Sequence, residues 1–183
     1  MNAKTDIIID AATAVFARYG FSKTTMGDIA TEAGVSRQTV YNAFASKEDV
    51  LRATLRKFGA KSVNDVTAMW VDADSFVAKI DLFHTYVPIK WFDITNSSPE
   101  WADLMEGMHK AAAEEVKALD DLWRAALTII FAAELSDDAP RSAADLVDFF
   151  YNASLNAKHG ATDVDHLRKR LDTVKAATLA LMG

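Results

Sequence analysis

A run of polar side chains near the N-terminus has the composition of a surface that reads DNA. An arginine can bind guanine through O6 and N7, a glutamine can bind adenine through N6 and N7, and a threonine can contact a thymine methyl group. Hydroxyl and ammonium groups can bind phosphates. Side chains of these kinds are Ser36, Arg37, Gln38, Thr39, Tyr41, Asn42 and Lys47, preceded by Thr24 and Thr25. We therefore expect this segment to contact double-stranded DNA.

The spacing of these residues suggests separate roles for them. Arg37, Gln38 and Thr39 are expected at the N-terminal end of a helix, from which side chains reach base edges in the major groove. Lys47 is expected in the first turn of the following helix, whose free backbone N–H groups can bind a phosphate. Thr24 and Thr25, at the start of an earlier helix, have the same geometry available.

Two short helices joined by a tight turn would position these side chains. The first opens at Thr25, with Asp28 three residues later, and closes before Gly34; the second runs from Ser36 through Phe44. A small residue, Ala30, lets the helices cross closely, and a glycine tolerates the positive φ of the turn. This pattern predicts a helix-turn-helix. The alternative is a generic three-helix packing whose polar face meets only water.

Helical periodicity continues through the rest of the sequence, so we expect an all-α fold. The chain has only seven glycines and three prolines, and it lacks long stretches in which apolar and polar residues alternate. Helices are predicted at 8–20, 46–70, 76–86, 99–121, 122–135, 141–158 and 163–182, with loops at 88–97 and 136–140.

The charge of the chain is unevenly distributed. The net charge is −6, but residues 1–61 carry nine basic and six acidic side chains, whereas the remainder carries eleven and twenty. A basic N-terminal segment followed by an acidic remainder is typical of a sequence-specific DNA-binding domain joined to a second domain. A protein that coats DNA without sequence preference would need a far more basic chain. Because the sequence lacks cysteine, a signal-peptide pattern and a long apolar run, we expect a cytoplasmic protein with no membrane segment.

Several motifs around the predicted helix-turn-helix resemble one known family. They are Phe21-Ser22-Lys23-Thr24-Thr25, Ile29-Ala30, Ala33-Gly34-Val35-Ser36, Thr39-Val40-Tyr41-Asn42-Ala43-Phe44 and Ser46-Lys47-Glu48-Asp49-Val50-Leu51. Over about residues 6–58 the sequence resembles the N-terminal domain of the TetR family of regulators. It departs from some members at Ala43, where they place a histidine or a larger polar residue, so one phosphate contact is expected to be missing.

The resemblance implies a ligand-responsive transcriptional regulator, most often a repressor. It implies a homodimer whose recognition helices enter successive major grooves of a palindromic operator, and a helical C-terminal domain whose small-molecule effector moves the two heads apart. We accordingly predict a DNA-binding domain at 1–46 and an effector-binding and dimerisation domain at 47–183, connected by a helix at about 46–72.

Two apolar stripes near the C-terminus suggest how two copies pair. Their residues alternate at spacings of three and four, as in helices that pack into a four-helix bundle. They are Leu146, Phe150, Ala153, Leu167, Leu171, Val174 and Thr178. The alternative is that both stripes face the domain's own core.

The middle of the chain concentrates aromatic and methionine side chains, with a few polar groups between them. Such a mixture is typical of a pocket for an apolar or aromatic effector, although most of these residues also suit plain core filling. The predicted pocket residues are Phe83, His84, Tyr86, Trp91, Trp101, Met105, Met108, His109 and Trp123, with Asp81 as a further polar group.

Catalysis and metal binding find little support in the sequence. His84 and Asp81 can share a helix face, as can His109 and Glu106, but neither pair has a third ligand of known proximity. Nucleotide-binding glycine patterns, nucleophile elbows and H-E-x-x-H runs are missing. We therefore expect a protein that is not an enzyme and has no catalytic residues, cofactor or metal.

Overall fold

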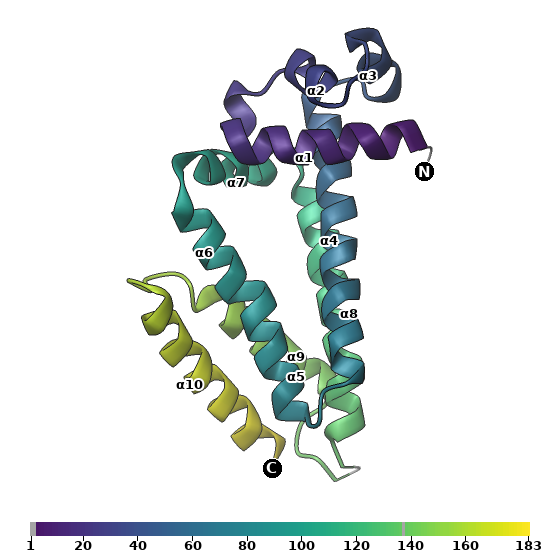
Figure 1. The fold of residues 1–183 in the computed structure, drawn as a ribbon. Helices are drawn as coiled ribbons and strands as arrows, with labels where there is room; N and C mark the ends of the chain where they lie inside the picture. The colour runs from purple at the N-terminus through teal and green to yellow at the C-terminus, as the bar shows by residue number, and fades with distance from the viewer. Residues whose placement is uncertain (1–2, 137) are drawn as a thin grey trace. The chain divides into compact units, whose positions relative to one another are not determined.

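The structure, a computed structural model, describes residues 3–136 and 138–183, and every regular element in this part of the chain is helical. The predicted all-α fold is confirmed. None of the described helices is long and apolar enough to span a bilayer. In chain order the elements are α1 (Ala3–Lys23), α2 (Met26–Glu32), α3 (Arg37–Ala43), α4 (Lys47–Val71), α5 (Phe76–His84), the π-helix η1 (Thr85–Ile89), α6 (Lys90–Ser97), α7 (Pro99–Ala111), α8 (Ala113–Glu134), α9 (Ala143–Asn156) and α10 (Val164–Met182) (Figure 1).

Packing divides the chain into two compact units, each built from two separate stretches. The head unit comprises Met1–Lys61 and Ile94–Leu119, and the body unit comprises Ser62–Asp93 and Asp120–Gly183. The helices α4, α6 and α8 each contribute one end to each unit. The division by function at residues 46 and 47 stays a prediction. It differs from the division by packing because α7 belongs to the head unit.

In the head unit, α7 packs along α1, and the two helices share one core with α2, α3 and the start of α4 (Figure 1). Gly107 of α7 lies so close to Phe21 that an added Cβ would be 2.7 Å from the Phe21 Cγ. Asp103 accepts a hydrogen bond from the Ser22 backbone N–H at 2.7 Å and a second from the Ser22 hydroxyl. Together these contacts fasten α7 to the end of α1.

The helix-turn-helix forms where it was predicted. Thr25 and Asp28 form a capping box at the start of α2, and Ser36 accepts a hydrogen bond from the Thr39 N–H at the start of α3. Gly34 in the turn has φ 64°, which a glycine adopts without steric strain. The Val35 N–H then donates to the Ala30 carbonyl at 3.0 Å. The turn is therefore fixed by one backbone conformation and two side-chain caps.

Two predicted breaks between helices are wrong. The expected loop at 88–97 is helical, because η1 widens by one residue around Pro88, so that the Lys90 N–H donates to the Thr85 carbonyl and α6 follows directly. The expected break near 119–121 is absent because α7 already ends at Ala111, before Ala112 with φ −138° and ψ 32°, and α8 runs on through this region. Asp120 instead accepts a hydrogen bond from the Tyr151 hydroxyl at 2.6 Å on the side of α8.

The core of the body unit is built from aromatic rings around Phe83. The Phe83 ring centroid lies 5.3 Å from that of Trp123 and 5.4 Å from that of Phe150, with tilted or edge-on geometry. Phe131 extends the cluster, at 5.5 Å from Phe150 and 4.9 Å from Phe76. Tilted and edge-on arrangements are favoured for aromatic rings, so the cluster contributes more than the area it buries.

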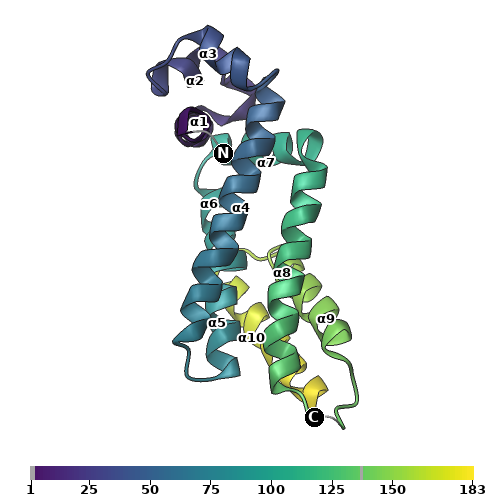
Figure 2. The same cartoon turned by 90° about the vertical axis from the view of Figure 1, so that its right-hand side faces the viewer.

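The predicted dimer stripe forms part of this unit's own core. Figure 2 shows α9 and α10 in the body unit, where the two helices pack against each other. Leu146, Phe150, Leu167, Leu171 and Thr178 are buried within the single chain, and Ala153 and Val174 are half-buried. Burial within one chain argues against a dimer contact at the five buried residues, and the dimer assignment of the stripe stays a prediction. An apolar stripe marks the buried face of a helix, but it does not say which molecule covers that face.

His84 is the one buried histidine among the described residues. Its Nε2 lies 3.0 Å from the Ser154 hydroxyl, and its ring stacks on Phe150 with 5.2 Å between centroids. Burial lowers the pKa of His84 from its ordinary 6.5 to about 4, because it outweighs the opposing effect of the Asp81 and Asp172 carboxylates, and the nearby Lys175 contributes to the lowering. The imidazole is therefore neutral at physiological pH.

The stability of the protein should fall as the pH is lowered from 6.5 towards 4. In this interval the unfolded chain takes up a proton at His84 while the folded chain does not, so protonation favours unfolding. Between pH 7 and pH 5 we expect this group to remove about 2 kcal/mol from the free energy of unfolding. Urea unfolding at both pH values measures the loss. In His84→Gln the loss should be smaller by that amount, and an equal loss in both proteins would contradict the assignment.

Substitutions of two glycines should have opposite effects on stability. Gly34→Val should destabilise the head unit by about 1–2 kcal/mol or more, because a β-branched residue resists the positive φ of the turn. No atom lies within 4 Å of the position of an added Cβ, so the effect isolates the backbone. Gly27→Ala, inside α2, should be neutral or stabilising by up to about 1 kcal/mol. Thermal unfolding of both variants tests the pair, and similar losses would argue against a backbone origin.

Candidate nucleic-acid interface

The polar face predicted to meet DNA is the exposed face of α3. Val40 is the buried residue of this helix, with none of its surface accessible, and it anchors α3 on α2. Arg37, Gln38, Tyr41 and Asn42 are exposed. Because α3 is held by one side, its N-terminal residues are presented together on the other.

Two contacts within this face hold the side chains in place. The Gln38 amide donates to the Asn42 Oδ1 at 2.8 Å, and the Arg37 guanidinium lies 5.7 Å from the centroid of the Tyr41 ring. An amide side chain has two donors and an accepting oxygen, so Gln38 keeps one donor and its acceptor for a base edge. Arg37 keeps all five donors, because stacking on a ring uses none. The face is thus ordered before any ligand binds.

The hydroxyl groups at the starts of α2 and α3 serve mainly as helix caps. The Ser36 Oγ accepts from the Thr39 N–H at 3.1 Å and lies 2.8 Å from the Thr39 hydroxyl. The Thr25 hydroxyl donates to the Asp28 carboxylate at 2.7 Å. Hydrogen bonds from the Thr25 hydroxyl and N–H hold the pKa of Asp28 below its usual range, so the start of α2 carries a negative charge. That charge weakens the case for a phosphate at Thr25.

Thr24 uses its hydroxyl inside the head unit, and its contact with DNA stays a prediction. Its side chain is buried, with 1% of its surface accessible, and its hydroxyl donates to the Gly20 carbonyl at 2.6 Å. It stabilises the irregular turn of α1 at Gly20, where φ is 77°. A phosphate cannot reach this hydroxyl without opening the head unit.

Lys47 is half-buried at the start of α4, where its ammonium group already has partners. It donates to the Phe21 carbonyl at 2.7 Å and to the Ser22 carbonyl at 3.3 Å, and it lies 4.4 Å from the centroid of the Phe21 ring. These carbonyls belong to the C-terminal turn of α1, where a positive charge is favoured. Its phosphate contact stays a prediction, and making it would require Lys47 to exchange at least one carbonyl.

The residues predicted to line an effector pocket fall in both packing units. In the head unit, Met108 belongs to the core around α1, and Trp101 and Met105 pack against it. His109 is exposed and bonds the Met105 carbonyl through Nδ1. In the body unit, Phe83, His84 and Trp123 are buried in the aromatic cluster, and Tyr86 and Trp91 are half-buried. Core filling accounts for the buried members, and the pocket assignment stays a prediction.

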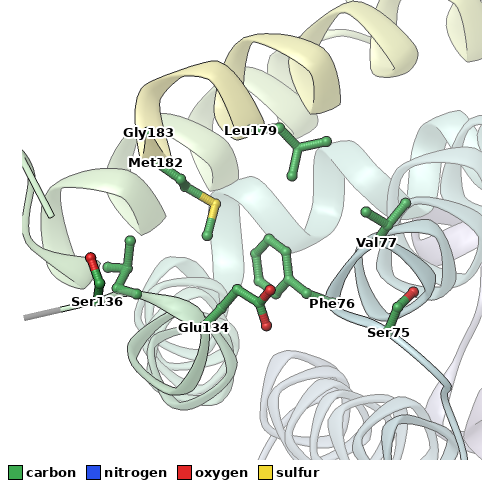
Figure 3. Close-up of a pocket in the computed structure, with 9 residues that line it drawn as sticks. Ser75, Phe76, Val77, Glu134, Ser136, Leu179, Met182 and Gly183 are labelled. Carbon is green, nitrogen blue, oxygen red and sulfur yellow. The ribbon is translucent and has the colours of Figure 1, made fainter.

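Cavities in the body unit lie partly at positions that the sequence did not indicate. One, of about 220 Å³, is bordered by the predicted His84 and Asp81 together with Arg168 of α10. Another, of about 350 Å³, lies where the start of α5 meets the ends of α8 and α10 (Figure 3). None of the predicted pocket residues lines this second cavity. Sequence periodicity could not reveal it, because it is formed by helix ends rather than by helix faces.

The comparison with protein families identifies the head of this chain. Residues 8–54 match the family model of bacterial regulatory proteins, tetR family. This segment contains α2, α3 and the turn between them.

Two curated relatives also match the N-terminal part. They are uncharacterized HTH-type transcriptional regulators of Bacillus subtilis (strain 168), YerO and YfiR. YerO is 38% identical over 64 residues, which are 35% of this chain and 22% of YerO. YfiR is 31% identical over 97 residues, which are 46% of this chain and 46% of YfiR. The matched part therefore spans less than half the length of either relative.

Solved structures match over nearly the whole chain. A TetR transcription regulator from Haloarcula marismortui ATCC 43049 superposes with a TM-score of 0.72 at 18% identity and covers 98% of both chains. The regulator FadR from Bacillus subtilis, solved with stearoyl-CoA, gives 0.65 at 16% identity and covers 97% of both. At these identities the likeness shows the fold alone. Residues 8–54 therefore form a domain of the tetR family of bacterial regulatory proteins, and the chain as a whole has the fold of the solved regulators.

Proposed function

We propose that this regulator is a repressor that binds a palindromic operator as a homodimer and leaves it when a small apolar or aromatic effector binds. The proposal concerns the operator, the dimer, the effector and the sign of regulation. Its DNA contacts are assigned to the exposed face of α3, with Arg37, Gln38 and Thr39 at base edges and Tyr41 and Asn42 at the backbone. Ser36, Thr25 and Lys47 lie at the edge of this face.

The observation that carries the proposal is the one-sided burial of α3. Of its seven residues, Val40 is buried, whereas Arg37, Gln38, Tyr41 and Asn42 are exposed. These four exposed side chains contact one another in two pairs, through the Gln38–Asn42 hydrogen bond and the stacking of Arg37 on Tyr41. An α-helix fits the major groove. Near its N-terminus an arginine can form two hydrogen bonds with a guanine, and a glutamine can form two with an adenine. A face that served only to meet water would not need this order.

A homodimer follows from the small size of a single α3 face. One recognition helix reads only a few base pairs, whereas two helices about 34–36 Å apart read both halves of a palindrome. The chain supplies apolar surface for pairing in the body unit. Leu122 and Ile129 of α8 are 48% and 71% exposed, and Phe149 of α9 is 40% exposed. These side chains are better placed than the buried stripe for the contact between two copies.

Release by an effector is supported by the composition of the body unit and by one similar structure. The body unit is rich in aromatic side chains and contains a cavity of about 350 Å³, a size that suits a small molecule. FadR of Bacillus subtilis, which shares the fold, was solved in complex with stearoyl-CoA. An effector that favours a different separation of the two heads would remove base and phosphate contacts together. A coupling of about 1–3 kcal/mol would lower operator affinity roughly 5- to 150-fold.

Selection of binding sites from a random DNA pool should recover a palindrome. Arg37→Ala should weaken binding to this site by about 1–3 kcal/mol and relax the preference at one base pair in each half-site. Binding should also weaken steeply with added salt, because phosphate contacts release counterions. Fluorescence anisotropy with the selected duplex measures both effects.

Arg141→Ala provides the matched control for this experiment. Arg141 is an exposed arginine of the body unit, so its loss changes the net charge equally without altering α3. Its affinity for the operator should stay at the wild-type level. Equal losses in both variants, or a pool with no enriched sequence, would show that α3 does not read bases.

Replacement of Ile129 by glutamate should separate the dimer without unfolding the chain. The side chain is 71% exposed in the single chain, so a charge is tolerated there in the monomer but not in an apolar contact. Analytical ultracentrifugation should find monomers, and operator affinity should fall while the helical circular-dichroism signal is kept. Thr173→Glu, an exposed position on α10, serves as control. A dimer that survives Ile129→Glu would exclude this surface.

A further inference from the structure

The cavity of about 350 Å³ at the ends of α5, α8 and α10 is open to solvent, and its lining combines polar and apolar groups. Five of its eight side chains are apolar, those of Phe76, Val77, Leu135, Leu179 and Met182. Figure 3 shows Phe76, Leu179 and Met182 pointing toward one another. Val77 and Leu179 remain 38% and 37% exposed. The volume lies at the lower end of the range for small-molecule sites, so it suits a ligand with a short hydrocarbon part.

One carboxylate lies at the edge of this lining. Glu134 is an exposed residue at the last position of α8, and it forms no hydrogen bond or ion pair with the residues that the structure describes. None of the residues lining the cavity is basic. The carboxylate is therefore free to accept a hydrogen bond from a ligand.

The helix ends around the cavity strengthen its negative character. Both α8 and α10 end there, and neither has a basic residue in its last turn. A helix C-terminus acts as about half a negative charge, and a helix N-terminus as about half a positive charge. The start of α5 also borders the cavity, with Ser75 capping the Ala78 N–H. Two C-termini and one carboxylate outweigh this single N-terminus, so the site favours a cation.

We propose that this cavity binds a small alkylammonium ion, with its nitrogen at Glu134 and its hydrocarbon part on Phe76, Leu179 and Met182. The ammonium N–H groups donate to the Glu134 carboxylate. A carboxylate ligand of the same length is repelled, and an alcohol keeps the apolar contacts but lacks the charge.

Three probes of equal chain length test the site on the full chain by isothermal titration calorimetry: hexylammonium, 1-hexanol and hexanoate. We expect hexylammonium to bind roughly 10-fold more tightly than hexanol, because hydrogen bonds between charged groups are the stronger kind. Hexanoate should not bind measurably. Equal affinity for hexylammonium and hexanol, or binding by none of the three, would overturn the proposal.

Variants then locate the bound cation. Glu134→Gln should weaken hexylammonium roughly 10-fold and leave hexanol unchanged, because it removes the charge and keeps the shape. Asp138→Asn, in the exposed loop that follows α8, removes the same charge outside the cavity lining and should have no such effect. Leu179→Lys places an ammonium of the chain in the cavity and should abolish binding. Hexylammonium that binds Glu134→Gln as it binds the wild type would exclude this site.

The role of this ligand as an effector rests on the proposed function and is measured separately. Hexylammonium should lower the affinity of the wild-type protein for the selected operator. In Glu134→Gln the same concentration of hexylammonium should lower that affinity less. If hexylammonium binds but operator affinity does not change, the binding site stands and its effector role fails. If the protein does not recognise an operator at all, the proposed function fails while calorimetry still decides the binding site.

Discussion

The exposed face of α3 depends on how closely α2 and α3 cross. The crossing leaves room for no more than a methyl group at Ala30, which is 4% exposed, while Val40 fills the space between the helices completely. Gly34 supplies the one backbone conformation that turns the chain sharply enough for the Val35 N–H to reach the Ala30 carbonyl. Val40 is the buried residue of α3, so the other side chains of the helix lie toward its sides and its outer face. The DNA-reading surface is thus set by a steric constraint on its hidden side.

The elements of the head could be predicted from the sequence because their signals are local. A cap, an acid three residues later and a glycine after the last turn act within one or two turns of helix, and they fixed the ends of α2 and α3. The breaks in the body did not follow such rules. Pro88 suggested a loop, yet a π-helical turn accommodates it. A break was predicted between 121 and 122, yet α8 is continuous there and Asp120 on its side accepts a hydrogen bond from Tyr151 of α9. These outcomes are decided by packing with distant residues.

The exposed face of α3 could be predicted from the sequence because helical periodicity indicates which side chains point away from the core. The four residues of α3 at the outer face of the predicted helix are exposed, as expected for positions away from Val40. Thr24 and Lys47 differ, because their polar atoms turn inward to carbonyls at the end of α1. A sequence shows that a hydroxyl or ammonium group is present, but not which unpaired carbonyl lies nearest. The cavity at Glu134 was missed for a related reason, since three helix ends meet there from distant parts of the chain.

The attachment of α7 to α1 has a consequence for the order in which this protein matures. Ser22 and its partner Asp103 are 81 positions apart. The head unit therefore still lacks α7 when its first 61 residues have been synthesised. At about 5–20 residues per second, α7 follows several seconds later. Until then the side of α1 that α7 covers is exposed to other nascent chains and to chaperones. The head unit can therefore finish folding only after Leu119 has been made, although its first 61 residues are synthesised much earlier.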